Sequence, residues 1–215
     1  MGRFDLVIFD CDGVLVDSER LSNEVFATML NEENCPATLE IMFEHFVGHS
    51  MPQCLELIQN LWNKTLTADF VERYRARVKA AFEAELQAVP GIEQVIDSLD
   101  CPYCVASSGS HEKMQTTLGI TGLLSKFENR RFSVSEVKES KPAPDVFLHA
   151  AKKMGVDPER CAVIEDSPTG VRAGLAAGMT VFAYAAMTPR KRLVDAGATR
   201  LFNVMSELPE LILAS

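Results

Sequence analysis

Two aspartates stand two positions apart directly after the first apolar run of the chain, in the segment Asp10-Cys11-Asp12-Gly13. If strand geometry persists through this segment, both carboxylates point to the same side of the chain. Two anions held so close repel each other, so a cation is implied or the pKa of one carboxyl group is raised. Magnesium suits such a place, because it takes oxygen ligands and keeps several waters and a phosphate oxygen. In isolation, however, the segment is more typical of a helix cap or a turn near Gly13.

Three later segments place other reactive side chains where a predicted strand ends or a predicted helix begins. Ser107 follows a short apolar run and opens a stretch of small hydroxyl residues, where backbone N–H groups and a hydroxyl could bind an oxyanion. Lys141 stands on a stiff Pro-Ala-Pro segment, and Glu165 and Asp166 end another apolar run. Ligands of open parallel sheets gather beyond the carboxyl ends of the strands. We therefore expect the acids, the hydroxyl and the lysine to complete one magnesium and phosphate site.

The elements that must position these residues alternate between short β-type runs and helical periodicity, which is typical of a parallel sheet flanked by helices. The predicted strands are Phe4–Phe9, Tyr103–Ser107, Arg131–Ser133, Cys161–Ile164, Thr180–Ala183 and Arg200–Phe202. The predicted helices are Ile92–Leu99, His111–Leu118, Asp145–Met154, Thr169–Ala177, Arg190–Ala196 and Glu207–Leu213. This pattern predicts an α/β fold with a doubly wound, Rossmann-like parallel sheet.

One long segment, from about Ser18 to Gln87, contains no convincing strand. Its apolar residues recur at helical spacing, and its breaks fall near Pro36, Pro52 and Lys64. This predicts roughly four helices inserted after the first strand. We expect a core domain of residues 1–16 and 88–215 and an α-helical cap domain of residues 17–87, joined by two short linkers that permit hinge motion.

The composition narrows the class of protein. Of 215 residues, 47% are hydrophobic and 24% charged, as expected of a folded globular chain. The 21 basic and 30 acidic side chains give a formal net charge of −9, which repels phosphate backbones and argues against a nucleic-acid partner. No apolar run approaches the roughly 20 residues of a membrane helix, and the N-terminus lacks the apolar core of a signal peptide. We expect a cytoplasmic protein with no membrane partner; the oligomeric state stays open, a monomer included.

Six cysteines are too sparse for a disulfide framework in a chain of this length. Cys101 and Cys104 have CxxC spacing, but no second pair supplies further zinc ligands. A redox pair would stand at a helix N-terminus, where the thiol pKa falls, whereas Cys104 begins an apolar run. A structural role in a buried strand is therefore favoured over a redox or metal role.

In their order along the chain, the motifs resemble those of the haloacid dehalogenase superfamily of phosphotransferases. They are Asp10-Cys11-Asp12-Gly13 with Asp17-Ser18, then Ser107, then Lys141-Pro142-Ala143-Pro144-Asp145, then Glu165-Asp166-Ser167 followed by Gly170, Ala173 and Ala177-Gly178. The chain looks like the subgroup with a helical cap after the first motif. Within it, the chain is most similar to the β-phosphoglucomutase and sugar-phosphatase branch, including 6-phosphogluconate-type phosphatases.

The resemblance implies a role for each acid of the site. Asp10 would be the nucleophile that forms an aspartyl-phosphate. Asp12 would be the general acid that protonates the leaving alcohol, and afterwards the base that activates water. Mg²⁺ would be held by an Asp10 carboxylate oxygen, the Asp12 backbone carbonyl and Asp166, with Glu165 as an outer or a direct ligand. A structural hydrogen bond to the neighbouring loop is the alternative for Glu165.

The resemblance also implies how the phosphate is held. Ser107 would hydrogen-bond a phosphoryl oxygen, and Lys141 would neutralise charge on both the phosphoryl group and the nucleophile. The alternative for Lys141 is an ordinary surface lysine. Asp17 and Ser18 are expected to stabilise the turn that leads to the cap.

The reaction favoured is hydrolysis of a small phosphorylated metabolite, a sugar phosphate or sugar-acid phosphate. In the mutase branch, a cap histidine helps to select sugar over water and a cap arginine grips the second phosphate; the matching positions here are Ser22 and Met51. Neither side chain can do that job. His49 and Ser50 are the cap residues expected to read the substrate, although His49 also suits an exposed loop. The alternatives are a β-phosphoglucomutase-like mutase and a phosphate-ester-binding module without turnover.

Overall fold

The computed structural model describes residues 4–47, 49 and 51–214. The chain forms two compact units, one of residues up to Asp17 and from Gln87 onward, the other of Ser18–Leu86. The two connecting segments run side by side. Val16 forms an antiparallel bridge with Ala88, and the Asp17 N–H donates to the Gln87 carbonyl oxygen at 2.9 Å. The unit boundaries fall one residue inside the expected cap of residues 17–87.

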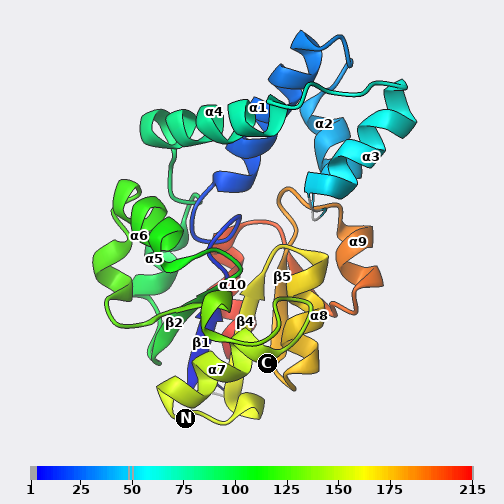
Figure 1. Cartoon of the computed structure of the whole chain (residues 1–215). Helices are drawn as coiled ribbons and strands as arrows, with labels where there is room; N and C mark the ends of the chain where they lie inside the picture. The colour runs from blue at the N-terminus through cyan, green and yellow to red at the C-terminus, as the bar shows by residue number, and fades with distance from the viewer. Residues whose placement is uncertain (1–3, 48, 50, 215) are drawn as a thin grey trace. The chain divides into compact units, whose positions relative to one another are not determined.

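The larger unit is built on a six-stranded parallel sheet with strand order β3-β2-β1-β4-β5-β6 (Figure 1). Every residue of the central strand β1 is fully buried. A strand covered on both faces reads as a continuous apolar run, which is how β1 was recognisable in the sequence. The strands are β1 Leu6–Phe9, β2 Tyr103–Ser107, β3 Arg131–Ser133, β4 Cys161–Glu165, β5 Thr180–Tyr184 and β6 Arg200–Phe202.

The register of the strands brings the predicted motifs together. Phe9, the last residue of β1, pairs with Val105 of β2 and with Ile164 of β4. The next residue, Asp10, continues the ladder, because its N–H donates to the Ile164 carbonyl oxygen at 2.9 Å. Asp10 therefore stands level with the carboxyl ends of both neighbouring strands.

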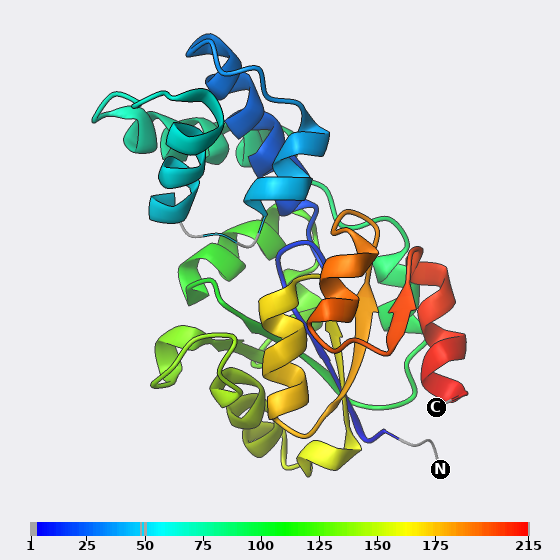
Figure 2. The ribbon, with the colours of Figure 1, turned by 90° about the vertical axis from the view of Figure 1, so that its right-hand side faces the viewer.

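Helices cover both faces of this sheet, and Figure 2 shows α8 (gold) and α10 (red) on opposite sides of it. On one face, Leu6 and Ile8 of β1 pack in a cluster with Phe147 of α7 and Val171 of α8. The doubly wound α/β fold is confirmed. The helices are α5 Ile92–Asp97, α6 His111–Ile120, α7 Asp145–Met154, α8 Pro168–Ala176, α9 Arg190–Asp195 and α10 Leu208–Leu213.

The observed elements agree with the predicted ones to within about two residues, and the first strand shows the clearest difference. It was expected from Phe4 but begins at Leu6. The Asp5 carboxylate accepts two hydrogen bonds, at 2.7 and 2.9 Å, from the Arg160 guanidinium. Regular pairing starts after this exposed ion pair. Phe4 is nevertheless buried, with its ring edge-on to that of Phe182.

The smaller unit is helical and has a core of its own. Three of its helices are long, and a single helical turn continues into a π-helical turn. Phe26 lies at the centre, with its ring near those of Phe46, Phe70 and Tyr74. In the part of the chain that the structure describes, no helix is long and apolar enough to span a membrane. The elements are α1 Ser18–Glu32, α2 Leu39–Ile41, the π-helical turn Met42–Phe46, α3 Met51–Trp62 and α4 Phe70–Glu85.

Candidate active site

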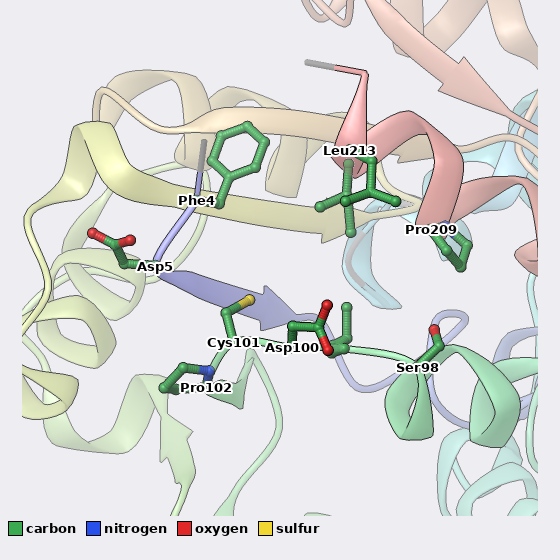
Figure 3. Close-up of a pocket in the computed structure, with 10 residues that line it drawn as sticks. Phe4, Asp5, Ser98, Asp100, Cys101, Pro102, Pro209 and Leu213 are labelled. Carbon is green, nitrogen blue, oxygen red and sulfur yellow. The ribbon is translucent and has the colours of Figure 1, made fainter. Parts of the chain in front are cut away.

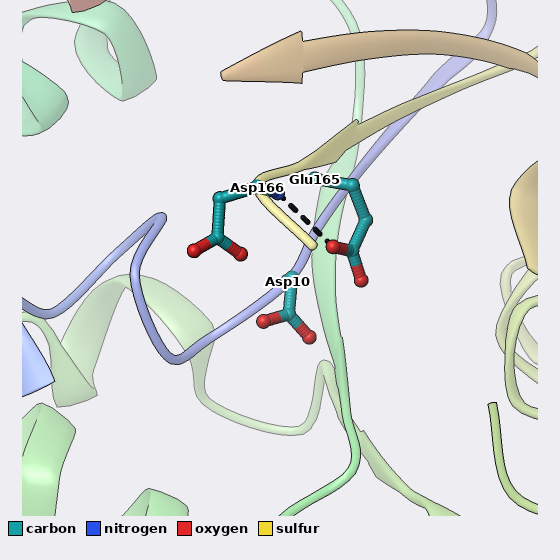
Figure 4. A group of neighbouring side chains, drawn as sticks. All are labelled: Asp10, Glu165 and Asp166. Carbon is teal, nitrogen blue, oxygen red and sulfur yellow. Dashed lines mark hydrogen bonds between the residues drawn. The ribbon is translucent and has the colours of Figure 1, made fainter. Parts of the chain in front are cut away.

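Three buried carboxylates meet at the carboxyl ends of β1 and β4 (Figure 4). Asp10 and Asp166 are each 7% exposed, and Glu165 is 1% exposed. One oxygen from each lies within 4.8 Å of the others. Burial raises the pKa of Asp10 to about 7, although the nearby Lys141 ammonium acts in the opposite direction. Such a cluster is costly unless cations accompany it.

Lys141 supplies one of those cations. Its side chain is 3% exposed, and Nζ donates to Asp10 Oδ1 at 2.5 Å, to Glu165 Oε1 at 2.8 Å and to the Ala106 carbonyl oxygen at 3.1 Å. Nζ also lies 4.5 Å from the centre of the Phe147 ring. Burial lowers the pKa of Lys141, but Asp10 and Glu165 outweigh that effect and raise it. Lys141 is a buried, charged residue, so it does not take the surface position that was the alternative.

Glu165 is held on both of its oxygens by the protein. Oε1 accepts from Lys141, and Oε2 accepts from the Asp166 N–H at 3.0 Å, shown dashed in Figure 4, and from the N–H and hydroxyl of Ser167 at 3.0 and 2.9 Å. The Glu165 carboxylate fills space that is open because residue 170 is a glycine. A Cβ on Gly170 would lie 1.7 Å from Glu165 Oε1. This bonding favours Glu165 as the residue that fixes Lys141.

Asp166 lies against the loop that follows β1. A Cβ on Gly13 would come within 2.1 Å of Asp166 Oδ2, and Gly13 also has a φ of +78°. Both observations require glycine, since other residues rarely adopt positive φ. The glycine of the first motif thus allows a carboxylate from the fourth motif to approach the backbone beside Asp10.

Ser107, which the resemblance implies would bind phosphate, ends β2 and is followed by a loop that the fold holds in place. The Ser107 side chain is buried, and its Oγ accepts from the Gly109 N–H at 2.9 Å. The Gly109 carbonyl oxygen in turn accepts from the Ser133 hydroxyl at 2.7 Å, which ties this loop to the end of β3. Ser110 caps α6 by accepting from the Lys113 N–H at 3.2 Å. The loop is therefore fixed from both sides, as an oxyanion site requires.

Asp12 lies outside the cluster of three carboxylates and pairs with a residue that sequence reasoning missed. Its Oδ2 accepts from Lys113 Nζ at 2.8 Å. The loop after β2 lies between this pair and Ser107: a Cβ on Gly109 would be 3.2 Å from Lys113 Cδ, 3.3 Å from Ser107 Oγ and 3.8 Å from Asp12 Oδ2. The signal that could have found this residue is the position of Lys113 in the first turn of α6, the helix that follows Ser107.

The core residues expected at the site are thus brought together at one end of the sheet. The two other residues expected to take part are outside the core unit. His49 is exposed and belongs to the helical unit, and Ser50 lies outside the described residues. Their expected contact with substrate stays a prediction.

A divalent cation fits the donor set. Asp10, Asp12, Glu165 and Asp166 carry four carboxylates, while Lys141 and Lys113 carry two ammonium groups. Two negative charges remain when all six groups are ionised, and carboxylate oxygens are the ligands that hard divalent cations prefer.

Two other features of the core unit, the pair of cysteines Cys101 and Cys104 and a pocket, lie apart from the carboxylate cluster. All six cysteines are free thiols, and burial raises the pKa of Cys101 and Cys104. This favours the structural role over a redox role, which needs a lowered thiol pKa.

A pocket of about 730 Å³ lies where β1 and β2 begin, lined in part by Phe4, Cys101 and Leu213 (Figure 3). It is at the opposite end of the sheet from the carboxylates.

The fold and site define a class of protein. A family model described as haloacid dehalogenase-like hydrolase matches residues 4–178, which include all the core residues above. The chain belongs to this family and is a hydrolase. It is similar to 6-phosphogluconate phosphatase of Escherichia coli (strain K12), with 35% identity over 98% of this chain and 96% of that protein.

Two solved structures share the whole fold. A conserved haloacid dehalogenase-like protein of unknown function from Agrobacterium tumefaciens is 33% identical, with a TM-score of 0.94 over 98% of each chain. A HAD family hydrolase from Deinococcus radiodurans R1, with bound phosphate and sodium, is 30% identical, with a TM-score of 0.88 over 99% of this chain and 96% of that one. The resemblance drawn from the motifs is confirmed at the level of the family.

Proposed function

We propose that the protein is a magnesium-dependent phosphatase that hydrolyses a sugar phosphate or sugar-acid phosphate through an aspartyl-phosphate on Asp10. The observation that carries this proposal is the buried ammonium of Lys141, 2.5 Å from Asp10 Oδ1, at strand ends that also hold Glu165 and Asp166. The name of the Escherichia coli relative, 6-phosphogluconate phosphatase, supports the substrate class. Phosphate bound in the Deinococcus relative supports a phosphoryl site.

In the first step, an Asp10 carboxylate oxygen attacks phosphorus while the bond from phosphorus to the alcohol oxygen breaks. Asp12 gives its proton to that oxygen, so the alcohol leaves neutral. In the second step, water attacks phosphorus, Asp12 accepts the proton of the water, and the bond to Asp10 breaks. Inorganic phosphate leaves, and both aspartates return to their starting forms.

Lys141 and Ser107 hold the phosphoryl group during both steps. The Lys141 ammonium already contacts Asp10, so it can offset negative charge on the nucleophile and on the phosphoryl oxygens together. The Ser107 hydroxyl is fixed by its bond to the Gly109 N–H. Glu165 keeps Lys141 in place.

Mg²⁺ would be held by an Asp10 carboxylate oxygen, the Asp12 backbone carbonyl and Asp166. When bound, it would screen Asp10 from the dianionic phosphate. The bonding of both Glu165 oxygens to protein donors favours an outer position for that residue.

The helical unit Ser18–Leu86 is proposed as the cap, whose closure would exclude bulk water while one nucleophile enters. His49 and Ser50 are its proposed substrate-reading residues. Without a second-phosphate arginine at the position of Met51, that nucleophile is water. The proposed place of action is the cytoplasm.

A panel of sugar phosphates and sugar-acid phosphates, assayed for phosphate release with Mg²⁺ and with excess chelator, tests this function. We expect release that needs the metal and one or a few preferred substrates. Full activity in excess chelator, or no release from any monoester including p-nitrophenyl phosphate, would contradict it. Product NMR on β-glucose 1-phosphate with a bisphosphate primer tests the alternative, because efficient formation of glucose 6-phosphate would identify a mutase.

A further inference from the structure

The side chain of Asp12 has an ion-pair partner for which the mechanism above gives no role. Asp12 Oδ2 and Lys113 Nζ are 2.8 Å apart, with the Asp12 side chain 17% exposed and that of Lys113 44% exposed. They come from segments 101 positions apart, the loop after β1 and the first turns of α6. This contact therefore depends on the tertiary fold.

The backbone around Asp12 is already fixed. The Gly13 N–H donates to the Val16 carbonyl oxygen at 2.9 Å, and the Val16 N–H donates to the Cys11 carbonyl oxygen at 3.1 Å. The freedom that remains to Asp12 lies in its side-chain torsions. A contact to one carboxylate oxygen therefore restricts where the proton-transferring group stands.

The ion pair holds Asp12 Oδ2 on the side of the site that carries Ser107 and Gly109. Gly109 separates Lys113 from Ser107, and a Cβ on this glycine would lie within 3.3 Å of Ser107 Oγ and within 3.8 Å of Asp12 Oδ2. Ser107 is the proposed phosphate ligand, so the contact holds the Asp12 carboxyl group beside the proposed phosphate-binding loop. The stem of Lys113 packs against the same glycine, which limits the motion of the lysine.

From this geometry we infer that Lys113 is a positioning residue: it holds one oxygen of the Asp12 carboxyl group beside the proposed phosphate-binding loop, so that the other oxygen can carry the proton given to the leaving alcohol. The inference rests on the proposed function. It predicts that loss of Lys113 matters most when the leaving group needs a proton, because alkoxides leave poorly and activated phenolates leave without help.

The test compares Lys113→Met, which keeps an unbranched stem against Gly109, with Lys113→Arg. Glucose 6-phosphate serves as the alkyl substrate, or whichever alkyl ester of the panel is hydrolysed best, and p-nitrophenyl phosphate as the activated one. Lys113→Met should lower kcat/KM about tenfold or more for the alkyl ester and less than about twofold for the aryl ester, because kcat/KM reports the step in which the alcohol leaves and not the later attack of water, which Asp12 also assists. Lys113→Arg keeps a positive charge and should retain most of the wild-type activity toward the alkyl ester. In an Asp12→Asn background, Lys113→Met should have little further effect, because residues that act through one another are not additive.

Equal losses of kcat/KM for both esters, or a full effect of Lys113→Met in the Asp12→Asn background, would overturn the inference and make Lys113 a substrate contact. Lys126→Met is the matched control, since it removes an ion pair with Asp97 on the surface. A crystal structure of Lys113→Met gives a readout without turnover: the Asp12 carboxylate should leave its place beside Gly109, and an unmoved carboxylate would also overturn the inference. If the wild type hydrolyses no ester, the proposed function fails, while this structure still decides whether Lys113 holds Asp12.

Discussion

Lys141 Nζ lies 2.5 Å from Asp10 Oδ1, although 131 positions separate the two residues. Both side chains are almost inaccessible to solvent, and Glu165 shares the same ammonium group. An uncompensated buried charge is far more costly than a paired one. Lys141 thus compensates the charge of two of the three buried carboxylates, in addition to its proposed role in binding phosphate.

Lys141→Met should therefore destabilise the metal-free protein, by about 3 kcal/mol, because it leaves Asp10 and Glu165 without their cation. Urea unfolding in the presence of chelator measures this. Added Mg²⁺ should recover part of the loss. Lys126→Met, which removes an exposed pair, should change the free energy of unfolding by less than about 1 kcal/mol. Equal effects of the two substitutions would contradict the role of Lys141 in compensating buried charge.

Asp10→Asn should keep the fold and lose at least about a thousandfold in kcat, since removal of a nucleophile is among the largest single losses in an enzyme. An amide oxygen cannot form the acyl phosphate. Circular dichroism and phosphate release on the same preparation check both halves of this statement. Substantial turnover by a folded Asp10→Asn protein would exclude the aspartyl-phosphate route.

Much of the site was predictable because parallel strands end at one edge of a sheet. Asp10, Ser107 and Glu165 each follow or end an apolar run in the sequence, and the strand register places these ends level. Lys141 was predictable for a different reason, its place on a proline-rich segment before α7. Its three hydrogen bonds show why a lysine is needed there.

The rest depended on contacts that leave no local pattern. Lys113 meets Asp12 only because α6 follows β2 and β2 lies beside β1. The outer role favoured for Glu165 follows from four hydrogen bonds that spacing does not reveal. The start of β1 was missed because Asp5 is paired with Arg160. The sequence pattern predicts which residues lie at the same edge of the sheet. Contacts between side chains of different elements can be identified only once the fold is known.

Asp166→Ala should raise the Mg²⁺ concentration needed for half-maximal rate by about tenfold or more, because even residues behind the ligands change metal affinity by that much. Ca²⁺ should fail to support turnover, since its looser coordination misplaces the attacking carboxylate. Titration of the rate with each metal checks both outcomes. Asp97→Ala, at an exposed aspartate paired with Lys126, is the control and should leave the Mg²⁺ requirement unchanged.

Gly170→Ala should lower the free energy of unfolding by about 2 kcal/mol or more, because the new Cβ would overlap the Glu165 carboxylate and overpacking is costly. Displacing Glu165 should also lower kcat through Lys141. Gly119→Ala is the matched control in α6, where the nearest atom to a new Cβ is 3.9 Å away. It should instead stabilise the protein by about 0.5–1 kcal/mol, as expected for an open helical glycine. Similar effects at both positions would show that the close approach to Glu165 is unimportant.

Glu136 joins the end of β3 to α6 and α7. Its Oε2 accepts from the Ser133 N–H at 2.8 Å and lies 2.9 Å from His111 Nε2, and its Oε1 lies 3.6 Å from His149 Nε2. Burial raises the pKa of Glu136, but the hydrogen bond from Ser133 and the two histidines outweigh it and hold the pKa below its ordinary value. The Ser133 hydroxyl in turn donates to the Gly109 carbonyl oxygen in the loop after β2.

A lowered carboxyl pKa stabilises the folded state at pH values above the ordinary pKa of the group, and this stabilisation is lost as the pH falls through the lowered value. Glu136→Gln should therefore reduce the free energy of unfolding by about 1 kcal/mol at pH 7. As the pH falls from about 7 to about 3, the difference from the wild type should shrink once the pH passes below the ordinary glutamate pKa of about 4.3, because the wild-type carboxylate then becomes neutral like the amide. Urea unfolding of both proteins across this range measures the difference, with Glu159→Gln, at an exposed glutamate, as the control. A difference that stays constant or grows toward pH 3 would show that the charge of Glu136 does not secure this junction.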